Sequence, residues 1–406
     1  MKILVYIFAF FCFFPYLDFL KLGTDTQPNA ILVGILILFV MSDKKLNGPL
    51  IALWSLFILS IIFAFDSQLQ VFVTVKTVFN YLSPALVAFT AYNIFLSTGY
   101  KIGYRFFLSV VLIYLFVGLV QNLVYPSFME PFLHNIRGTH IGGRGVTSLT
   151  NEPSFYGIHC LFLSILALLN FDKKQNFVLQ PLLFFQLLFL AKTSTAIGLL
   201  IVSFFAFGMV QVFRRKVKYI IILAVIIAAG VISFNSVMRA FEDTRLGSLA
   251  QDFIEDPLML TQVDQSASVR LTATFAPFIG IKENFFMPFG FGRYNSFVSD
   301  MYYQQKYRKL IIPYTLKNRD KIGGGINVIL FHFGFLGLLF PLAVYYSFRN
   351  KIDEPKFLFS LILFILLLTT IQLMNAMIGF IIGYVLYTTT HENNEIENLP
   401  ETMSVI

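Results

Sequence analysis

An arginine and a carboxylate lie close together just before a strongly hydrophobic segment. Arg144 and Glu152 are separated mainly by glycine, threonine and serine, and Asn151 directly precedes the carboxylate. Pro153 follows, and proline is well suited to the first turn of a helix. The sequence therefore predicts that Glu152 and Asn151 lie at the N-terminal mouth of a helix, where the helix dipole and free N–H groups favour anions.

This carboxylate has two interpretations. In the first, Glu152 is ionised and accepts a proton or orients a sugar hydroxyl. In the second, it only caps the helix and pairs with Arg144. Charges at a membrane boundary need a physical reason, and a site for an anionic, membrane-borne substrate supplies one.

A second cationic stretch follows Arg270, where Gly290-Phe291-Gly292 leads directly into Arg293, Tyr294 and Asn295. Glycines allow the backbone to approach a ligand closely, and the guanidinium presents five donors in a planar fork. Phosphate or pyrophosphate is the natural partner of such a group. A simple tight turn is the alternative explanation for the two glycines.

The composition defines the elements that must position these residues. The chain of 406 residues is 57% hydrophobic and 13% charged, with a mean hydropathy of +0.74, whereas soluble domains are about 25% charged. We predict an all-α polytopic membrane protein. Cys12 and Cys160 lie in apolar runs, and the five histidines show no ligand spacing, so we expect no disulfide framework, metal or cofactor. His159 and His332 are expected to be hydrogen-bonded core residues.

About twelve hydrophobic stretches are long enough to be predicted as spans. They lie near residues 3–20, 28–42, 49–66, 71–97, 103–125, 154–170, 177–192, 194–213, 219–235, 326–347, 357–373 and 375–390.

Lysine and arginine in the short connections predict the orientation, because cytoplasmic connections carry an excess of both. Five basic connections fall on one side if the N-terminus is cytoplasmic, and the polar tail 391–406 falls there too. The net charge of +8 is then an orientation signal and no indication of nucleic-acid binding. The five connections are residues 43–45, 101–105, 172–174, 214–218 and 349–351.

This orientation places two long segments outside a single membrane domain that covers residues 1–406. They are residues 126–153 and a large loop of residues 236–325, which is rich in aromatic side chains. Loops of this length usually carry function or are disordered. Arg144, Glu152, Arg270 and Arg293 would therefore all lie on the outer side.

The chain resembles the Wzy-type O-antigen or capsule repeat-unit polymerases, in the superfamily that includes the O-antigen ligases. Arg144-Gly145 with Asn151-Glu152-Pro153-Ser154 resembles their Arg-Gly…Glu-Pro-Ser/Asn entry into a helix. Arg270 and the stretch Met287-Pro288-Phe289-Gly290-Phe291-Gly292 resemble their Arg…Asn-Pro-x-x-Gly-x-Gly pattern. The segment from Asn327 to Gly334 and Gly337 resembles the opening of the following helix.

The resemblance implies a GT-C-like glycosyltransferase of the bacterial inner membrane that works without nucleotide sugar or metal. Undecaprenyl-diphosphate-linked glycans would be both donor and acceptor, and a chain-length-regulating co-polymerase is a candidate partner. Arg144, Arg270 and Arg293 would stabilise the pyrophosphate, and Glu152 would be the base, with His140 as a second candidate. The expected ligands of pyrophosphate and glycan also include Tyr294, Asn295, Asn151 and Asn327.

One departure favours a polymerase over a ligase. Ligases commonly present a His-Asn pair where the large loop re-enters the membrane, whereas Ile326 precedes Asn327 here. A ligase remains one alternative, and a flippase or transporter of lipid-linked oligosaccharide is another. A transporter should line a central cavity with charges from several spans, but this chain concentrates its charges in the outer loops.

Overall fold

A computed structural model describes residues 2–19, 26–67, 69–99, 102–136, 145–214, 265–304, 306–307 and 324–397. Within these ranges the regular elements are all helical, and the one β-bridge joins Leu17 to Leu133. This confirms the all-α prediction for the part of the chain that is described.

The helices follow the apolar segments of the sequence. In chain order they are α1 (Lys2–Phe13), α2 (Asn29–Val40), α3 (Gly48–Ala64), α4 (Val71–Thr98), α5 (Tyr104–Leu123), η1 (Glu130–Phe132), α6 (Pro153–Asn170), α7 (Lys173–Phe185), η2 (Gln186–Ala191), α8 (Ser194–Phe213), α12 (Gln265–Glu283), α13 (Tyr294–Tyr303), α15 (Gly325–Phe333), η3 (Gly334–Leu338), α16 (Leu339–Phe348), η4 (Arg349–Lys351), α17 (Pro355–Leu368) and α18 (Ala376–Glu397).

Helices occupy eleven of the twelve expected spans, and the expected span 219–235 lies outside the described residues. Five described helical stretches are long and apolar enough to cross a membrane: Val71–Thr98, Tyr104–Leu123, Pro153–Asn170, Ser194–Phe213 and Gly325–Lys351. The chain is therefore a membrane protein, while the count of twelve spans stays a prediction.

Two expected spans differ in detail from the helices observed. The first was expected over residues 3–20, but α1 ends at Phe13, because Pro15 has no N–H to donate and cannot continue the helix. The expected span 326–347 is divided into α15, η3 and α16. The division falls at Gly334, whose φ of +56° lies in the left-handed region.

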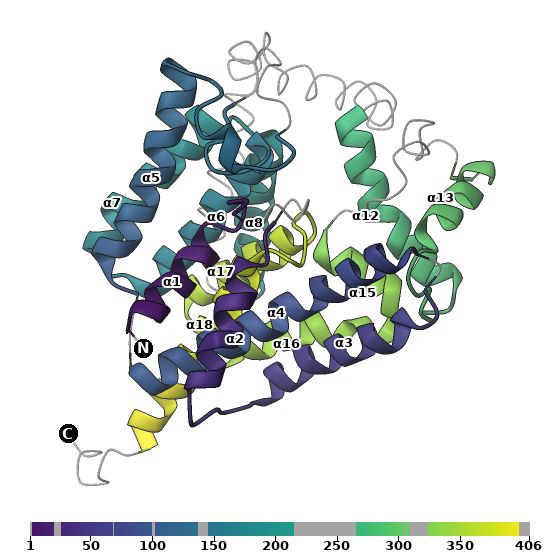
Figure 1. Cartoon of the computed structure of the whole chain (residues 1–406), viewed down its shortest axis with the longest axis horizontal. Coiled ribbons are helices and arrows are strands. Elements are labelled where there is room, and N and C mark those ends of the chain that lie inside the picture. The colour runs from purple at the N-terminus through teal and green to yellow at the C-terminus, as the bar shows by residue number, and fades with distance from the viewer. Residues whose placement is uncertain are drawn as a thin grey trace.

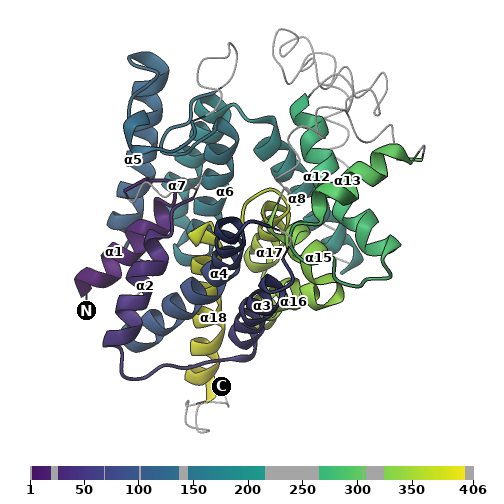
Figure 2. The same ribbon diagram turned by 45° about the vertical axis from the view of Figure 1, so that its right-hand side comes forward.

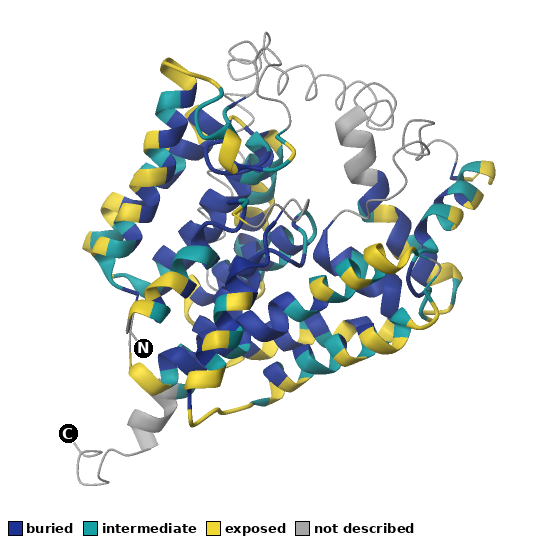
Figure 3. Ribbon diagram, viewed as in Figure 1, coloured by how far each residue is buried: buried dark blue, intermediate teal, exposed yellow. Residues whose placement is uncertain are grey.

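Helix α6 lies at the centre of one helix group. In its most apolar stretch 72% of the residues are buried, against 22% in α8. Figure 3 shows α6 largely buried and α5 exposed along one side. α4 and α18 form another close pair, because Gly379 and Gly383 let the backbones approach. A Cβ added at Gly383 would lie 2.5 Å from the Ala88 carbonyl oxygen.

The helix ends separate into two sides of the molecule. In Figures 1 and 2, α1 begins and α18 ends in the lower half, whereas α5 ends near the top and α12 lies at the upper right. We call the side where α5 ends and α6 begins the outer end, after the orientation predicted from the basic connections.

Candidate active site

The structure describes most of the predicted site residues. Arg270 lies within α12, although its side chain is not described, and His140 and Arg144 lie outside the described residues. The side chains that are described belong to Asn151, Glu152, Arg293, Tyr294, Asn295 and Asn327. We call residues 145–154 the first outer segment and residues 284–295 the second outer segment.

Glu152 begins α6, as the sequence predicted. It is the N-cap residue, its backbone is extended (φ −145°, ψ 151°), and Pro153 follows as the first helical residue. The Glu152 side chain makes no capping hydrogen bond to the backbone; instead its Oε2 accepts a hydrogen bond from Ser154 Oγ at 3.0 Å. Glu152 therefore occupies the N-cap position without a side-chain hydrogen bond to the helix backbone, and both its catalytic role and its pairing with Arg144 stay predictions.

A buried polar turn precedes Glu152. Thr147, Ser148 and Thr150 have no exposed surface, and Asn151 is 1% exposed. Thr150 Oγ1 donates to the carbonyls of Thr147 at 2.8 Å and Glu152 at 2.9 Å. Because the backbone of the turn is bonded internally, Glu152 is held in one position relative to the first turn of α6.

Gln121 of α5 holds this turn in place through its side-chain amide. Its Oε1 accepts from the Ser148 N–H at 2.6 Å and from Thr147 Oγ1 at 3.4 Å. Its Nε2 donates to the Ser148 carbonyl at 3.0 Å and the Phe128 carbonyl at 2.8 Å. A single amide that is 2% exposed thus satisfies both backbone groups of Ser148, whose φ of +50° requires such support.

Two tyrosines extend the network into the membrane helices. Ser148 Oγ donates to the Tyr114 carbonyl at 2.7 Å, and the Tyr156 hydroxyl donates to Gln186 Oε1 at 2.8 Å. Both tyrosines are fully buried. The ring of His159 packs against Tyr114 with centroids 4.5 Å apart. Within the described residues neither His159 nitrogen meets a hydrogen-bond partner, so its expected hydrogen bond is not seen.

The second outer segment forms a tight turn, which was the alternative explanation for its two glycines. Gly290 and Gly292 have φ values of +76° and +81°, which glycine adopts readily. The N–H of Phe289 donates to the Phe331 carbonyl at 3.2 Å, and that of Gly290 donates to the His332 carbonyl at 3.0 Å. The turn therefore lies against the end of α15, where the helix breaks at Gly334.

His332 connects this turn to α4. Its Nδ1 lies 2.7 Å from the Tyr81 hydroxyl, which confirms the expected hydrogen-bonded core histidine. The ring of Phe291 stacks on Tyr81 at 6.1 Å and packs edge-on against His332 at 4.7 Å. All three side chains are buried, so the second outer segment is anchored on the membrane helices.

Gly334→Ala tests this anchor. A Cβ at Gly334 would lie 2.3 Å from the Phe286 carbonyl oxygen, and the backbone φ is left-handed. We expect destabilisation of more than about 1 kcal/mol, seen as a lower thermal midpoint in detergent. Gly198→Ala in α8 is the control, since a Cβ there meets nothing within 4 Å. Equal midpoints for the two variants would contradict this account of the break.

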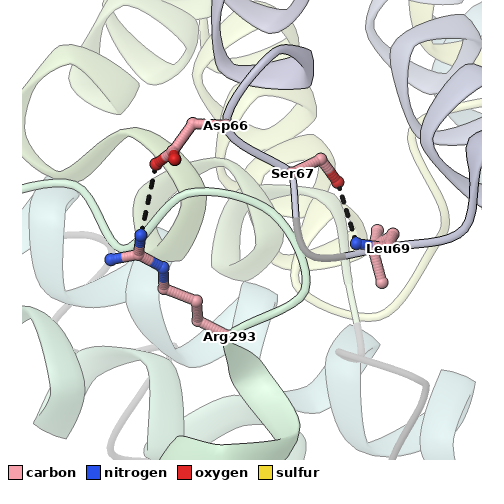
Figure 4. A network of polar contacts seen from close by, with 4 residues as sticks. All are labelled: Asp66, Ser67, Leu69 and Arg293. Atoms are coloured by element: carbon pink, nitrogen blue, oxygen red, sulfur yellow. Dashed lines mark hydrogen bonds and ion pairs between the residues drawn. The ribbon is translucent and has the colours of Figure 1, made fainter.

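Arg293 is paired with a carboxylate from another loop. Its Nη2 lies 3.2 Å from Asp66 Oδ2 in the connection between α3 and α4, and Figure 4 shows the pair beside Ser67, whose hydroxyl accepts from the Leu69 N–H at 3.1 Å. Both partners are exposed, with 43% of the Arg293 side chain and 81% of the Asp66 side chain accessible. An exposed ion pair is weak and screened by salt, so an anionic ligand can displace Asp66.

Tyr294 and Asn295 follow in the first turn of α13. The Tyr294 ring is 9% exposed and packs edge-on against Phe331 at 5.4 Å, and burial raises the pKa of its phenol. Asn295 is half-buried. Their roles in glycan binding stay predictions, although the packing of Tyr294 places most of its ring against protein.

Asn327 lies where α15 begins. It is fully buried, and its Nδ2 donates to the Thr369 carbonyl at 3.4 Å, while the Gly325 N–H donates to the Ile371 carbonyl at 2.8 Å. Ile326, the residue before Asn327, is 7% exposed. These hydrogen bonds hold the start of α15 against the residues that follow α17, and the residue before Asn327 is apolar.

In Figures 1 and 2 the first outer segment lies near the top, between α5 and α6, whereas the second lies at the right-hand side, between α12 and α13. Among the described residues, no group of three or more histidine, cysteine, aspartate or glutamate side chains is arranged to hold a metal ion. No protein-family model matches this sequence, and no curated protein is significantly similar to it.

Proposed function

We propose that this membrane protein polymerises undecaprenyl-diphosphate-linked oligosaccharide repeat units into O-antigen or capsule polysaccharide on the periplasmic face of the bacterial inner membrane. The observation that carries the proposal is the position of Glu152. Its carboxylate lies at the mouth of a central helix and accepts a hydrogen bond from Ser154 Oγ at 3.0 Å. A turn of buried hydroxyl residues precedes it in the chain. Such preorganisation suits a group that must accept a proton.

In the proposed reaction a hydroxyl of the incoming repeat unit attacks the anomeric carbon of the growing chain. The new glycosidic C–O bond forms as the bond from that carbon to the diphosphate oxygen breaks. Glu152 takes the hydroxyl proton, and undecaprenyl diphosphate leaves with the bonding electrons. Negative charge grows on the diphosphate, so Arg144, Arg270 and Arg293 stabilise the transition state. The chemistry uses no metal ion or nucleotide sugar.

Two observations favour polymerisation over the alternatives. Position 326 carries a buried isoleucine in place of the histidine common in ligases, which favours chain extension over attachment of finished chains. A flippase needs charged side chains along a central path through the membrane. The described helices that could span it are apolar, and the candidate cations Arg144, Arg270 and Arg293 belong to the two predicted outer loops. A chain-length-regulating co-polymerase is a proposed partner.

The direct test is incubation of the purified protein with lipid-linked repeat units. A polymerase produces a ladder of longer lipid-linked glycans, separated by electrophoresis. A ligase produces no ladder but transfers glycan to lipid A-core, and a flippase forms no bond in either assay. Deletion of the gene provides a cellular readout, because loss of a polymerase leaves lipopolysaccharide with a single repeat unit.

Asp66→Asn should strengthen donor binding. The variant removes the carboxylate that lies 3.2 Å from the Arg293 guanidinium and frees the cation for pyrophosphate. We expect the KM for the lipid-linked donor to fall about two- to fivefold at low ionic strength, because exposed pairs contribute about 0.2–1 kcal/mol. Asp353→Asn, which breaks the pair with Arg214, is the control. An unchanged KM in Asp66→Asn at low salt would remove Arg293 from the donor site.

A further inference from the structure

The connection between α7 and α8 contains a strained lysine. The last turn of the α7 segment is a π-helix, η2, and Lys192 ends it with φ +45° and ψ +40°. A lysine gains nothing from this left-handed conformation, which costs of order 1–3 kcal/mol for residues other than glycine. π-helical turns and left-handed residues both concentrate at functional sites.

The residues before Lys192 contact the first outer segment. The Val146 N–H donates to the Leu190 carbonyl at 2.8 Å, and a Cβ added at Gly145 would lie 2.0 Å from the Ala191 carbonyl oxygen. Only glycine therefore fits at position 145.

The residue after Lys192 contacts the first turns of α6. A Cβ added at Gly157 would lie 2.1 Å from Thr193 Cγ2, and Thr193 is 6% exposed. Gly157 lies one turn from Pro153, where the helix begins beside Glu152. Lys192 is thus held between the Gly145 backbone and the N-terminal end of α6.

The Lys192 side chain is exposed in this position. It makes no hydrogen bond or ion pair with any described residue, in contrast to Arg293 and Arg214, which pair with Asp66 and Asp353. An exposed cation near the N-terminal end of α6 adds positive potential to the mouth of that helix. Its natural complement is a multiply charged anion.

We propose that Lys192 binds the diphosphate of the lipid-linked donor at the mouth of α6. This inference rests on the proposed function and adds a cation to its site. The ammonium acts as a point charge on the phosphate oxygens, and its flexible stem follows the diphosphate as charge grows during departure. The strained backbone fixes where that stem begins.

The kinetic test compares three variants of the full-length protein. Lys192→Asn removes the charge with a residue that tolerates the left-handed conformation, Lys192→Arg keeps the charge, and Lys174→Gln is the control at the other end of α7, where the lysine is also exposed. We expect Lys192→Asn to lower kcat/KM for the donor about tenfold or more, and the other two to stay within about twofold of the wild type, tenfold corresponding to about 1.4 kcal/mol. Wild-type kinetics in Lys192→Asn would overturn the assignment.

A labelling test separates this proposal from the proposed function. Cys12 and Cys160 are buried, so Lys192→Cys supplies a single accessible thiol for a membrane-impermeant maleimide. Undecaprenyl diphosphate should protect this thiol, whereas phosphatidylglycerol and undecaprenol should not. Equal protection by phosphatidylglycerol would reveal a general anionic-lipid contact and overturn the assignment. Specific protection together with no ladder from the wild-type protein would support the diphosphate site and reject polymerisation.

Discussion

Replacing Glu152 by glutamine is expected to lower the rate of chain extension by about 10²- to 10⁴-fold, the range that general base catalysis contributes. Glutamine has nearly the same shape, and its amide oxygen can still accept the hydrogen bond from Ser154 Oγ that Glu152 Oε2 accepts at 3.0 Å. The amide cannot take a proton from the acceptor hydroxyl. The substitution therefore separates the chemistry of the carboxylate from its place in the fold.

Glu130→Gln is the matched control for this experiment, because Glu130 belongs to the same connection and is half-buried like Glu152. We expect its turnover and donor KM to match those of the wild type. Both variants should be compared at equal thermal stability, measured with a dye that reacts with the buried thiols of Cys12 and Cys160 on unfolding. A Glu152→Gln rate within a few-fold of wild type would reduce Glu152 to a positioning role.

Local sequence rules located the entry to α6 correctly. The Glu152-Pro153 pair predicted the helix start because proline lacks an N–H that the first turn does not need, and α6 begins at Pro153. The glycine turn was predictable for a similar reason, since Gly290 and Gly292 both adopt positive φ. In each case the constraint acts on the residue itself or on its immediate neighbours.

The long-range contacts that hold the site in place could not be predicted from local sequence rules. Gln121 lies in an otherwise apolar stretch of α5, and its partner Ser148 is 27 residues away, so neither periodicity nor a local motif joins them. An amide within a predicted span is a signal in itself, because buried polar groups must find partners. Lys192 was missed because it looked like the ordinary polar end of a span, and its conformation depends on the π-helical turn before it.

Gln121→Leu is expected to destabilise the protein by at least about 3 kcal/mol and to abolish most of its activity. The leucine has similar volume, but it leaves the Ser148 N–H and the carbonyls of Ser148 and Phe128 without the partners that lie within 3.0 Å now. Each unsatisfied buried group costs about 1–3 kcal/mol. The thiol-reactive dye should therefore show a lower unfolding midpoint.

Gln121→Glu distinguishes a positioning role from a general loss of stability. In the variant, one carboxylate oxygen still accepts a hydrogen bond from the Ser148 N–H. The other oxygen faces the carbonyls of Ser148 and Phe128, which in the wild type receive hydrogen bonds from Gln121 Nε2. Protonation restores a donor to that oxygen, so the activity of this variant relative to wild type should rise as the pH is lowered. Asn122→Leu, at the exposed neighbouring position, should leave both stability and pH profile unchanged. If Gln121→Glu showed the wild-type pH profile at full activity, the turn before Glu152 would not depend on the amide, and Glu152 would have to be positioned by other contacts.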